Sequence, residues 1–540
     1  MEPLLAIVIA TAVSVAIIPV AWRFAPALGL LDKPDPRKVH TIPVPRVGGW
    51  GIVLGALLPM AILLRLDPLM QSYLFGALVL FGFGLWDDAR DIGHYKKFLG
   101  QIIAVSAMVF HGHLTIDRPP FFDFKSIPHG FAVALTYFAM IGMINAVNHS
   151  DGLDGLAGGE SLLSLIIIAF LASTVDGAVT LIICAATIGG ILGFLRYNTH
   201  PAKVFMGDTG SQFLGFTLGF LAILLTQRLH TALSPALTLM FLGLPIIDII
   251  AVLIQRIYKK MNWFAASRNH IHHRLLDLGF DHYETVVIIY LIQTSFMLGA
   301  ITLRYNSDLV IIGLYLFAAA LIFATLITLE RRGWRAHREA GTFRLSRLVR
   351  TFRQHPAVAQ APFWIVAVAV PGYLLAASLI VPIVPRDFGV ISAVLAVVCL
   401  IELFSRRTDL PFTVRGSIYV VVLFSLFLVH GENSAGMLGS DFSFVYFGLL
   451  ALAIAFAVRY SAEIKFQTTP MDYLILLGVV MIAIGGDRLL EFRELSSVIV
   501  KAVILLYGCE VIIEKMRGRW NLLTVVTTLA LGILAYKGLH

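Results

Sequence analysis

Charged residues are scarce in this sequence: Asp, Glu, Lys and Arg make up 14% of its 540 residues, while hydrophobic residues make up 58%. This composition nearly excludes a soluble globular protein and indicates that a lipid bilayer is the solvent. Apolar runs of about 20 residues, the length that crosses roughly 30 Å of hydrocarbon, recur along the chain. We count about 18 of them, about 11 up to residue 330 and about 7 beyond residue 360. The predicted fold class is therefore all-α, a polytopic transmembrane helical bundle.

Cysteine is also rare, and the three cysteines, Cys184, Cys399 and Cys509, lie apart in apolar runs. They have neither paired spacing nor histidine neighbours, so the sequence suggests no disulfide framework and no thiolate metal site. The first apolar run lacks both a preceding basic residue and a following small-residue cleavage site. It is therefore expected to be a retained span, with its N-terminus outside, rather than a signal peptide.

The net charge of +8 would suit nucleic-acid binding, but in a membrane protein the placement of Lys and Arg is more informative. With an external N-terminus and alternating spans, the inner loops through the segment after Glu330 carry roughly 22 Lys and Arg and the outer loops roughly 5. This bias predicts a cytoplasmic first loop, and no nucleic-acid partner is expected. The long inner loops contain every motif described below, so the active face is predicted to be cytoplasmic.

A strongly basic stretch from Arg331 to His355 divides the chain. Within it, Leu345, Leu348, Val349 and Phe352 recur at the spacing of one helix face, which predicts an amphipathic helix at the membrane interface. A solvated basic linker is the alternative. Either interpretation predicts three parts: a membrane domain at 1–330, a basic cytoplasmic linker at 331–360, and a second transmembrane domain of unknown function at 361–540.

Three carboxylates follow one of the apolar runs, at Asp87, Asp88 and Asp91. Each would cost about 2.5 to 3.5 kcal/mol at the centre of a membrane helix, so they are expected at the water interface. Adjacent carboxylates need a cation such as Mg2+, Lys or Arg beside them. Lys97 follows about ten residues later and could cover a phosphate, although lysines beside a bilayer also serve as topological anchors. The alternative interpretation is that these residues only end the helix, but this would account for one Asp better than for three.

The stretch from Asn145 to Gly159 is rich in glycine and in oxygen ligands, with Asn148, Asp151 and Asp154 among them. Glycines let a backbone approach a ligand closely, amides can read the edge of a base, and carboxylates can bind a hard cation. A calcium loop is the rival interpretation, but the spacing lacks the terminal Glu of an EF-hand.

A second inner-loop motif runs from Asn198 to Ser211 and places Asp208 between glycines just before an apolar span. Mg2+ normally takes one or two carboxylates together with substrate phosphate oxygens. Asp208, completed by Asn148 and a pyrophosphate, is therefore a candidate Mg2+ ligand. A structural helix-capping role for Asp208 is the alternative.

The last long inner loop contains a dense cationic cluster, Arg268-Asn-His270-Ile-His272-His273-Arg274. We interpret it as a phosphate-binding motif. Zinc is the competing interpretation, but this spacing puts the three imidazoles on different sides of a helix and no cysteine is near.

Asp248 lies inside an apolar span, where ionisable residues are functional candidates by default. A structural ion pair with Arg256, two turns away, is the alternative.

Together these motifs resemble those of the polyprenyl-phosphate N-acetylhexosamine-1-phosphate transferase family (glycosyltransferase family 4), in particular its undecaprenyl-phosphate GlcNAc-1-phosphate transferase branch. The resemblance spans residues 1–330, beyond which the sequence departs from many relatives. It rests on the first inner loop at 32–49, the Asp87–Asp88 pair, the 145–159 loop, Gly207–Asp208 and the 270–273 histidine motif.

The resemblance implies a helical bundle with a cytoplasmic active site and a groove for the lipid carrier. Asn148 and Asp208 would hold Mg2+, with Mn2+ as the alternative ion. Asp154 and Asn198 match positions that contact the uracil of the substrate. His149-Ser150 stands where relatives often carry apolar residues, which is a departure from the family's pattern.

Lys97 and Arg268 match phosphate contacts of the family, and Asp87 and Asp88 match the pair assigned to the carrier phosphate. The predicted site residues are, for catalysis, Asp87, Asp88, Lys97 and Asp151; for substrate binding, Lys38, Arg46, Asp154, Asn198, Arg268, His270, His272 and His273; and for the metal, Asn148 and Asp208.

The implied enzyme transfers an N-acetylhexosamine 1-phosphate, GlcNAc-1-phosphate by the form of the histidine motif, from a UDP-sugar to undecaprenyl phosphate and releases UMP. It would act in the bacterial inner membrane and initiate cell-wall, lipopolysaccharide or exopolysaccharide synthesis. Because the second pKa of a phosphate monoester is near 6, the carrier is mostly a dianion at pH 7 and hardly needs a strong base. Asp87 and Asp88 are therefore expected to orient the carrier rather than to form a covalent intermediate.

A transporter or lipid flippase is the alternative from another functional class. Transporters place their binding groups near the midplane on broken helices, whereas the polar motifs of this chain fall in inner loops. The expected partners are a UDP-sugar, undecaprenyl phosphate and the bilayer. Two further partners are left open, a second copy of the chain and other glycan-assembly enzymes, for which residues 361–540 would provide a docking surface.

Overall fold

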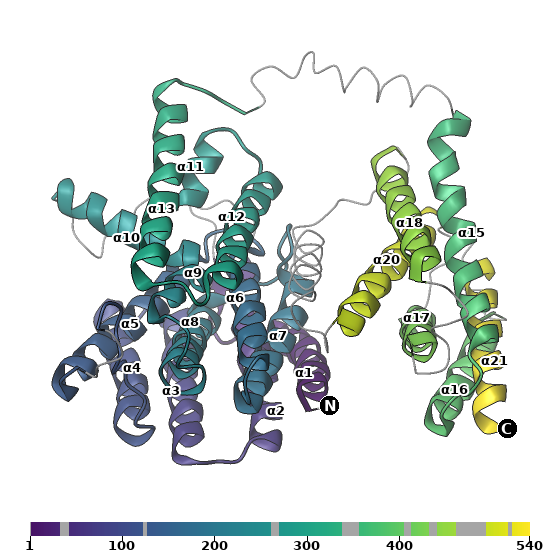
Figure 1. The fold of residues 1–540 in the computed structure, drawn as a ribbon, viewed down its shortest axis with the longest axis horizontal. Coiled ribbons are helices and arrows are strands. Elements are labelled where there is room, and N and C mark those ends of the chain that lie inside the picture. Colours follow the sequence, from purple (N-terminus) through teal and green to yellow (C-terminus); the bar gives the residue numbers. More distant parts are fainter. Residues whose placement is uncertain are drawn as a thin grey trace. The chain divides into compact units, whose positions relative to one another are not determined.

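The protein is helical throughout the part that the computed structural model describes, which is residues 2–32, 43–122, 127–260, 269–336, 356–403, 412–430, 440–460, 493–516 and 521–540 (Figure 1). This confirms the predicted all-α polytopic fold. Most of the basic linker, with its predicted amphipathic helix, lies outside the described residues. The helices of residues 2–336 are α1 (Glu2–Phe24), α2 (Gly48–Leu63), α3 (Pro68–Arg90), α4 (His94–Ser106), η1 (Ala107–His111), α5 (His129–Ser150), α6 (Leu156–Ser173), α7 (Ala178–Asn198), α8 (Gly207–Leu224), η2 (Leu225–Leu229), η3 (Pro235–Leu237), α9 (Thr238–Phe241), α10 (Gly243–Tyr258), α11 (Ile271–Asp277), α12 (His282–Leu303) and α13 (Asp308–Arg331).

Among the described residues, nine helices are long and apolar enough to cross a membrane. Residues Pro235–Phe241 and Gly243–Tyr258 form a bent pair, with an angle of 89°, that is either a broken span or a re-entrant loop. Several shorter apolar helices, including α2, accompany them. The expected count of about 18 spans stays a prediction, because parts of the chain lie outside the described residues.

The described residues form two compact units, one up to residue 336 and one from residue 356 onward. The second unit is built around an apolar core to which every one of its helices contributes. Its most polar feature is a cluster in which Arg415 and Tyr419 of one helix bind Glu510 of another. The helices of this unit are α15 (Pro356–Ile380), α16 (Arg386–Leu403), α17 (Phe412–His430), α18 (Ser440–Tyr460), α20 (Arg493–Lys515) and α21 (Asn521–Leu539).

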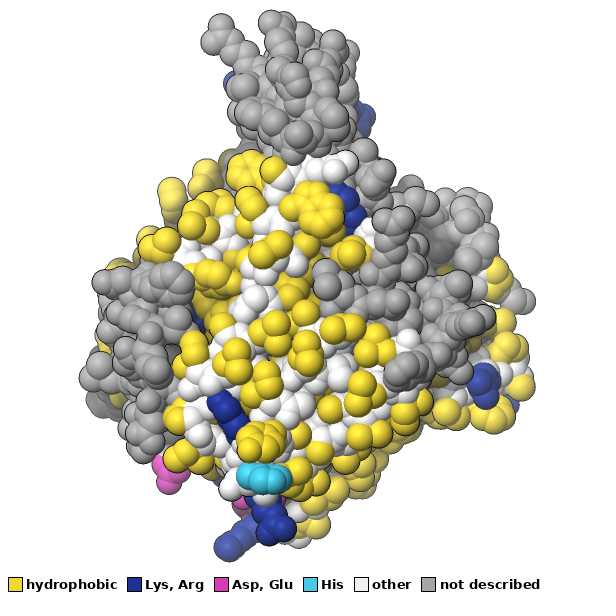
Figure 2. All heavy atoms as spheres, turned by 90° about the vertical axis from the view of Figure 1, so that its right-hand side faces the viewer, with side chains coloured by type: hydrophobic (Ala, Val, Ile, Leu, Met, Phe, Trp, Pro, Cys, Tyr) yellow, Lys and Arg dark blue, Asp and Glu magenta, His cyan; other side chains and the backbone are white. Residues whose placement is uncertain are grey.

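The outward surface of the helices suits lipid. Large apolar side chains such as Trp364, Ile365 and Val368 of α15 are more than half exposed. Figure 2 shows a face on which the described side chains are mainly hydrophobic and only a few are charged. Such a surface is costly in water and favourable in hydrocarbon, so the chain is a multi-pass membrane protein.

Helix α8 is the central element of the first unit. The apolar window of this span is buried along its whole length, and α2, α3, α5 and α6 pack around it. Glycines at several crossings allow close approach: a Cβ atom at Gly215 of α8 would lie 2.6 Å from the Cα of Ile144 in α5. Because α8 is held from all sides, the polar groups at its N-terminus have fixed neighbours.

Helix ends are set by local signals in the sequence. Asp67 caps α3 by accepting a hydrogen bond from the Met70 amide at 2.7 Å, and Asp281 forms a capping box with Glu284 at the start of α12. Such side chains satisfy the amides that have no partner in the first helical turn. The only β-structure among the described residues is a short antiparallel pair, β1 (Leu31–Asp32) and β2 (Val44–Pro45).

Candidate active site

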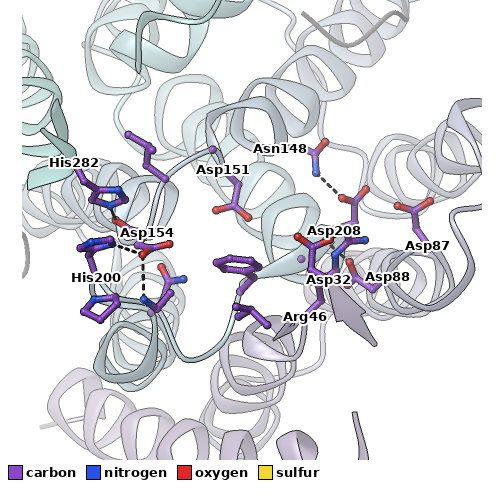
Figure 3. Close-up of a pocket in the computed structure, with 18 of the residues that line it drawn as sticks. Asp32, Arg46, Asp87, Asp88, Asn148, Asp151, Asp154, His200, Asp208 and His282 are labelled. Carbon is purple, nitrogen blue, oxygen red and sulfur yellow. Dashed lines mark hydrogen bonds and ion pairs between the residues drawn. The ribbon is translucent and has the colours of Figure 1, made fainter. Parts of the chain in front are cut away.

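A pocket of about 750 Å3 opens where many helices of the first unit begin or end (Figure 3). Its polar residues lie in terminal turns: Asp87 ends α3, Asn148 ends α5, Lys97 begins α4 and Asp208 begins α8. The polar and charged lining residues are Asp32, Arg46, Asp87, Asp88, Asp91, Lys97, Asn148, Asp151, Asp154, Asn198, His200, Asp208, His273 and His282. The volume is that of a small-molecule binding site, and all but two of the predicted site residues that the structure describes line it.

Lys97 links two carboxylates that are far apart in sequence. Its Nζ lies 2.7 Å from Oδ2 of Asp87 and 2.6 Å from Oδ2 of Asp208. Burial by itself would lower the pKa of Lys97, but Asp208 and Asp87 outweigh it and raise that pKa above its usual value. Lys97 is therefore a permanent cation between two acidic groups.

Asp208 also accepts a hydrogen bond from Nδ2 of Asn148, at 3.1 Å from Oδ1, and the same amide nitrogen donates to Ser211 Oγ at 2.8 Å. These contacts use the nitrogen of Asn148 and leave its carbonyl oxygen as a ligand. Asp151 lies nearby in the same pocket (Figure 3). Enclosure by protein, together with Asp208 and Asp88, raises the pKa of Asp151 to about 7. A set of carboxylate and amide oxygens with excess negative charge fits a hard divalent cation.

Asp88 has a structural environment that differs from that of its neighbour Asp87. Its two oxygens accept hydrogen bonds from the amides of Asp208 and Thr209, at 2.8 and 3.0 Å, and from the Thr209 hydroxyl at 2.6 Å. Asp88 thus caps α8 from another helix, where a carboxylate is favoured by the helix dipole. Gly207 makes this possible, because a Cβ atom there would lie 2.6 Å from each carboxylate oxygen of Asp88.

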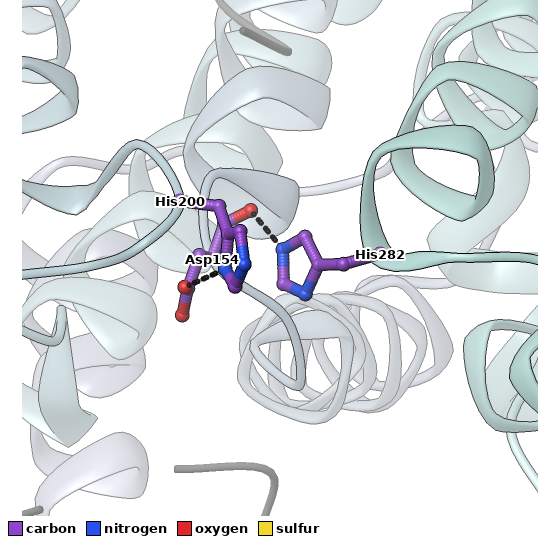
Figure 4. A group of neighbouring side chains, drawn as sticks. All are labelled: Asp154, His200 and His282. Carbon is purple, nitrogen blue, oxygen red and sulfur yellow. Dashed lines mark hydrogen bonds and ion pairs between the residues drawn. The ribbon is translucent and has the colours of Figure 1, made fainter. Parts of the chain in front are cut away.

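Asp154, His200 and His282 gather at the opposite end of the pocket (Figures 3 and 4). Oδ2 of Asp154 lies 2.6 Å from Nδ1 of His200 and accepts from the Ala202 amide at 3.0 Å. The rings of His200 and His282 stack with centroids 4.0 Å apart. The three residues offer ligand atoms within 4.8 Å of one another and could hold a metal ion, and Oδ2 of the carboxylate is already engaged by His200 and Ala202.

Asn198 lines the same end of the pocket, but both polar atoms of its amide bind backbone. Its Oδ1 accepts from the Gly155 amide at 2.8 Å, and its Nδ2 donates to the Val204 carbonyl at 2.9 Å. Asn198 therefore ties the 145–159 loop to the 198–211 loop. Its predicted uracil contact remains a prediction.

The three histidines of the 270–273 motif occupy different places. His273 lines the pocket, whereas His270 and His272 are buried behind it. His270 Nδ1 lies 2.6 Å from Oδ2 of Asp248, so His270 is a hydrogen-bond partner of Asp248. A structural pair with Arg256 was the alternative to a functional role for this residue. A helical face does not predict the Asp248–His270 pair, because Asp248 lies on α10 and His270 directly precedes α11.

Two predicted residues, Lys38 and Arg268, also lie outside the described residues. Arg46 is described and forms an ion pair with Asp32 at the rim. The residues that the sequence did not single out are Asp32, His200, His282 and Phe205, which all line the pocket. His200 and Phe205 fall inside the 198–211 motif, so their closeness in sequence to Asp208 could have identified them as candidate site residues. His282 follows the histidine motif by nine residues, and nothing local distinguished it.

The fold and the pocket together define an integral membrane protein with an acidic pocket at the ends of its helices. A family model for glycosyl transferase family 4 matches residues 70–226, which include Asp87, Asp151 and Asp208.

Curated relatives match a longer part of the chain. It is 35% identical over 333 residues to the probable undecaprenyl-phosphate N-acetylglucosaminyl 1-phosphate transferase of Bacillus subtilis (strain 168), covering 60% of this chain and 92% of that protein. It is 32% identical over 335 residues to the undecaprenyl-phosphate alpha-N-acetylglucosaminyl 1-phosphate transferase of Yersinia pestis, covering 60% and 90%. It is 30% identical over 334 residues to the decaprenyl-phosphate N-acetylglucosaminephosphotransferase of Mycobacterium leprae (strain TN), covering 55% and 83%. The chain belongs to glycosyl transferase family 4, which confirms the expected family.

Proposed function

We propose that this protein transfers GlcNAc-1-phosphate from UDP-GlcNAc to undecaprenyl phosphate at the cytoplasmic face of the bacterial inner membrane, releasing UMP. The product would initiate a lipid-linked cell-envelope or exopolysaccharide glycan. The observation that carries the proposal is the convergence of Lys97, Asp87, Asp208 and Asn148 in one pocket. The relatives named for GlcNAc-1-phosphate transfer support the substrate and the carrier.

Both reactants are anions, so the main tasks of the site are to neutralise their charge and to align the two phosphate groups. An oxygen of the carrier phosphate attacks the sugar-linked phosphorus of the UDP-sugar and forms a new P–O bond. The bond from that phosphorus to the bridging oxygen breaks, and UMP leaves with the electron pair. Lys97 and Arg46 supply positive charge within the pocket, and no covalent enzyme intermediate is needed because the carrier is already a dianion.

Asp208 and Asn148 would hold Mg2+, with Mn2+ as the alternative, because the Asn148 amide nitrogen binds the Asp208 carboxylate and leaves the amide oxygen of the same side chain available as a second ligand. A divalent ion at this place would neutralise the pyrophosphate and orient it. Asp87, whose Oδ2 faces Lys97, would orient the carrier phosphate through that ammonium. Asp151 adds a further carboxylate to the metal end, and Asp154 with Asn198 would form the nucleobase end.

His273 and Arg46 line the pocket and would contact the substrate phosphates, and Lys38 and Arg268 would bind the same substrate. His270 and His272, which are buried and do not line the pocket, would serve substrate binding by supporting His273. We extend the proposal to the domains. Residues 1–330 would be the transferase domain, 331–360 a basic cytoplasmic linker, and 361–540 a membrane domain that docks other glycan-assembly enzymes or a second copy of the chain. The transporter alternative is not favoured, because the pocket is built from terminal helical turns rather than from groups at mid-span.

The test is UMP release by the purified full chain with undecaprenyl phosphate, Mg2+ and a panel of UDP-sugars, with Asp208→Asn as the control. We expect release that needs both carrier and divalent ion, is fastest with UDP-GlcNAc, and falls on the order of a hundredfold or more in the variant. Absence of UMP release with every sugar would overturn the proposal. Equal release without the carrier would point to a hydrolase instead.

A further inference from the structure

Asp248 is a buried carboxylate in a helix of the predicted membrane region, and the proposed reaction gives it no role. Its side chain accepts two hydrogen bonds, from His270 Nδ1 to Oδ2 at 2.6 Å and from the Ile271 amide to Oδ1 at 2.8 Å. His270 and Ile271 are the first residues of the segment that becomes α11. One carboxylate of α10 therefore fixes both the backbone and the first side chain of α11.

The ring of His270 lies between two other imidazoles. It stacks on His149 with centroids 5.5 Å apart, and on His272 with centroids 5.7 Å apart and ring planes 9° from parallel. His149 is next in sequence to Asn148, whose amide binds Asp208. One side of the His270 ring is thus one residue away from the metal end of the pocket.

The His270 ring is also linked to the pocket through its stacking on His272. A Cβ atom at Gly152 would lie 2.3 Å from Nε2 of His272, so this ring packs directly on the Gly152 backbone. Nε2 is buried and has no hydrogen-bond partner among the described residues, so this end of the ring is held by packing against Gly152. Gly152 adjoins Asp151, and both line the pocket.

From this chain of contacts we propose that Asp248 is a positioning residue, which through His270 and His272 holds the 148–152 segment and His273 in place around the substrate phosphates. The inference rests on the proposed transfer reaction. It assigns no direct contact between Asp248 and substrate, because the carboxylate is buried behind the pocket and does not line it.

The first variant is Asp248→Asn, which keeps the size of the side chain but removes its charge. We expect kcat for UMP release to fall on the order of ten- to a hundredfold, because small displacements of site residues have effects of that size. UMP affinity should stay within about twofold of wild type, because the Asp154 end of the pocket is not touched. Tyr315→Phe is the matched control: it removes a 2.9 Å hydrogen bond to the α10 backbone at Gly243 without affecting α11, and it should leave kcat unchanged.

The second variant is Gly152→Ala, which disturbs the same chain of contacts at its other end, where Gly152 packs on His272. If the two ends act through one path, the double variant Asp248→Asn/Gly152→Ala will lose little more activity than the worse single variant. Hydrogen exchange of the 148–156 peptides, measured without substrate, should accelerate in both single variants but not in Tyr315→Phe.

Three results would overturn the inference: wild-type kcat in Asp248→Asn, additive losses in the double variant, or unchanged exchange at 148–156. The exchange measurement does not depend on turnover. Failure of wild-type UMP release would therefore refute the proposed reaction, while unchanged exchange in the variants would refute the positioning role by itself.

Discussion

Replacing Lys97 by Gln removes the ammonium that lies against both Asp87 and Asp208. The Lys97 side chain is 26% exposed, and the two carboxylates are 6% and 21% exposed, so water replaces the lost contacts only in part. Loss of one partner from a buried charged pair costs about 3 to 5 kcal/mol, and the partial exposure of this site places the expected loss toward the lower end. The variant should therefore unfold at a lower temperature than wild type when divalent ions are removed with EDTA.

Added Mg2+ should distinguish the effect of Lys97→Gln on stability from its effect on turnover. Without Lys97 the two carboxylates repel each other, so added Mg2+ should raise the unfolding temperature of Lys97→Gln more than that of wild type. Turnover should remain about a hundred- to a thousandfold lower, because a preorganised positive group that faces the phosphates is missing. Lys97→Arg is the control, since it keeps the charge while changing the position of the donor groups.

Thermal unfolding in detergent with EDTA or Mg2+, paired with UMP release, checks both halves of the prediction. The reasoning about Lys97 would be refuted by a variant that turns over at more than half the wild-type rate. It would equally be refuted if Mg2+ stabilised wild type and variant to the same extent, because the ammonium and the divalent ion would then not share these carboxylates.

Two further substitutions test the supports of the site. Gly207→Ala places a Cβ atom 2.6 Å from the Asp88 oxygens at a residue with φ of +70°, so it should destabilise the fold by about 1 to 2 kcal/mol or more and lower the unfolding temperature. Asn198→Ala removes the hydrogen bonds to Gly155 and Val204 and should cost about 1 to 3 kcal/mol. Because those bonds join two pocket loops, UMP affinity measured by calorimetry should fall as well, and wild-type values for both stability and affinity would contradict this role.

Much of the architecture could be predicted from the sequence because membrane helices are constrained by their solvent. Apolar length sets the spans, and every backbone polar group must be satisfied inside hydrocarbon, which leaves helices as the natural solution for runs of this composition. The grouping of the motifs was predictable for the same reason. Carboxylates such as Asp87 and Asp208 are too costly at mid-span, so they fall at helix ends, where the packing of the helices brings them together.

The partners of individual side chains were not predictable to the same degree. A structural pair of Asp248 with Arg256 was the alternative to a functional role, because helical periodicity reports only neighbours on one helix. The observed partner of Asp248, His270, begins another helix. His282 was missed for a related reason: its closeness to Asp154 and His200 depends on how α12 packs on the loops after α5 and α7, and a sequence pattern carries no such distance.

The separate roles of Asp87 and Asp88 could not be predicted from the sequence either, because the sequence does not show which group each carboxylate contacts. Successive residues of a helix point about 100° apart, so two adjacent carboxylates cannot both face the same ligand. The Asp87 side chain meets Lys97 in the pocket, whereas that of Asp88 meets the N-terminus of α8. Asp88 has its oxygens engaged by the Asp208 and Thr209 amides, so it is poorly placed to act as a nucleophile and well placed to fix Asp208. A pair that the sequence presents as one motif thus divides into a residue that binds Lys97 and a residue that holds a metal-ligand candidate, Asp208, in place.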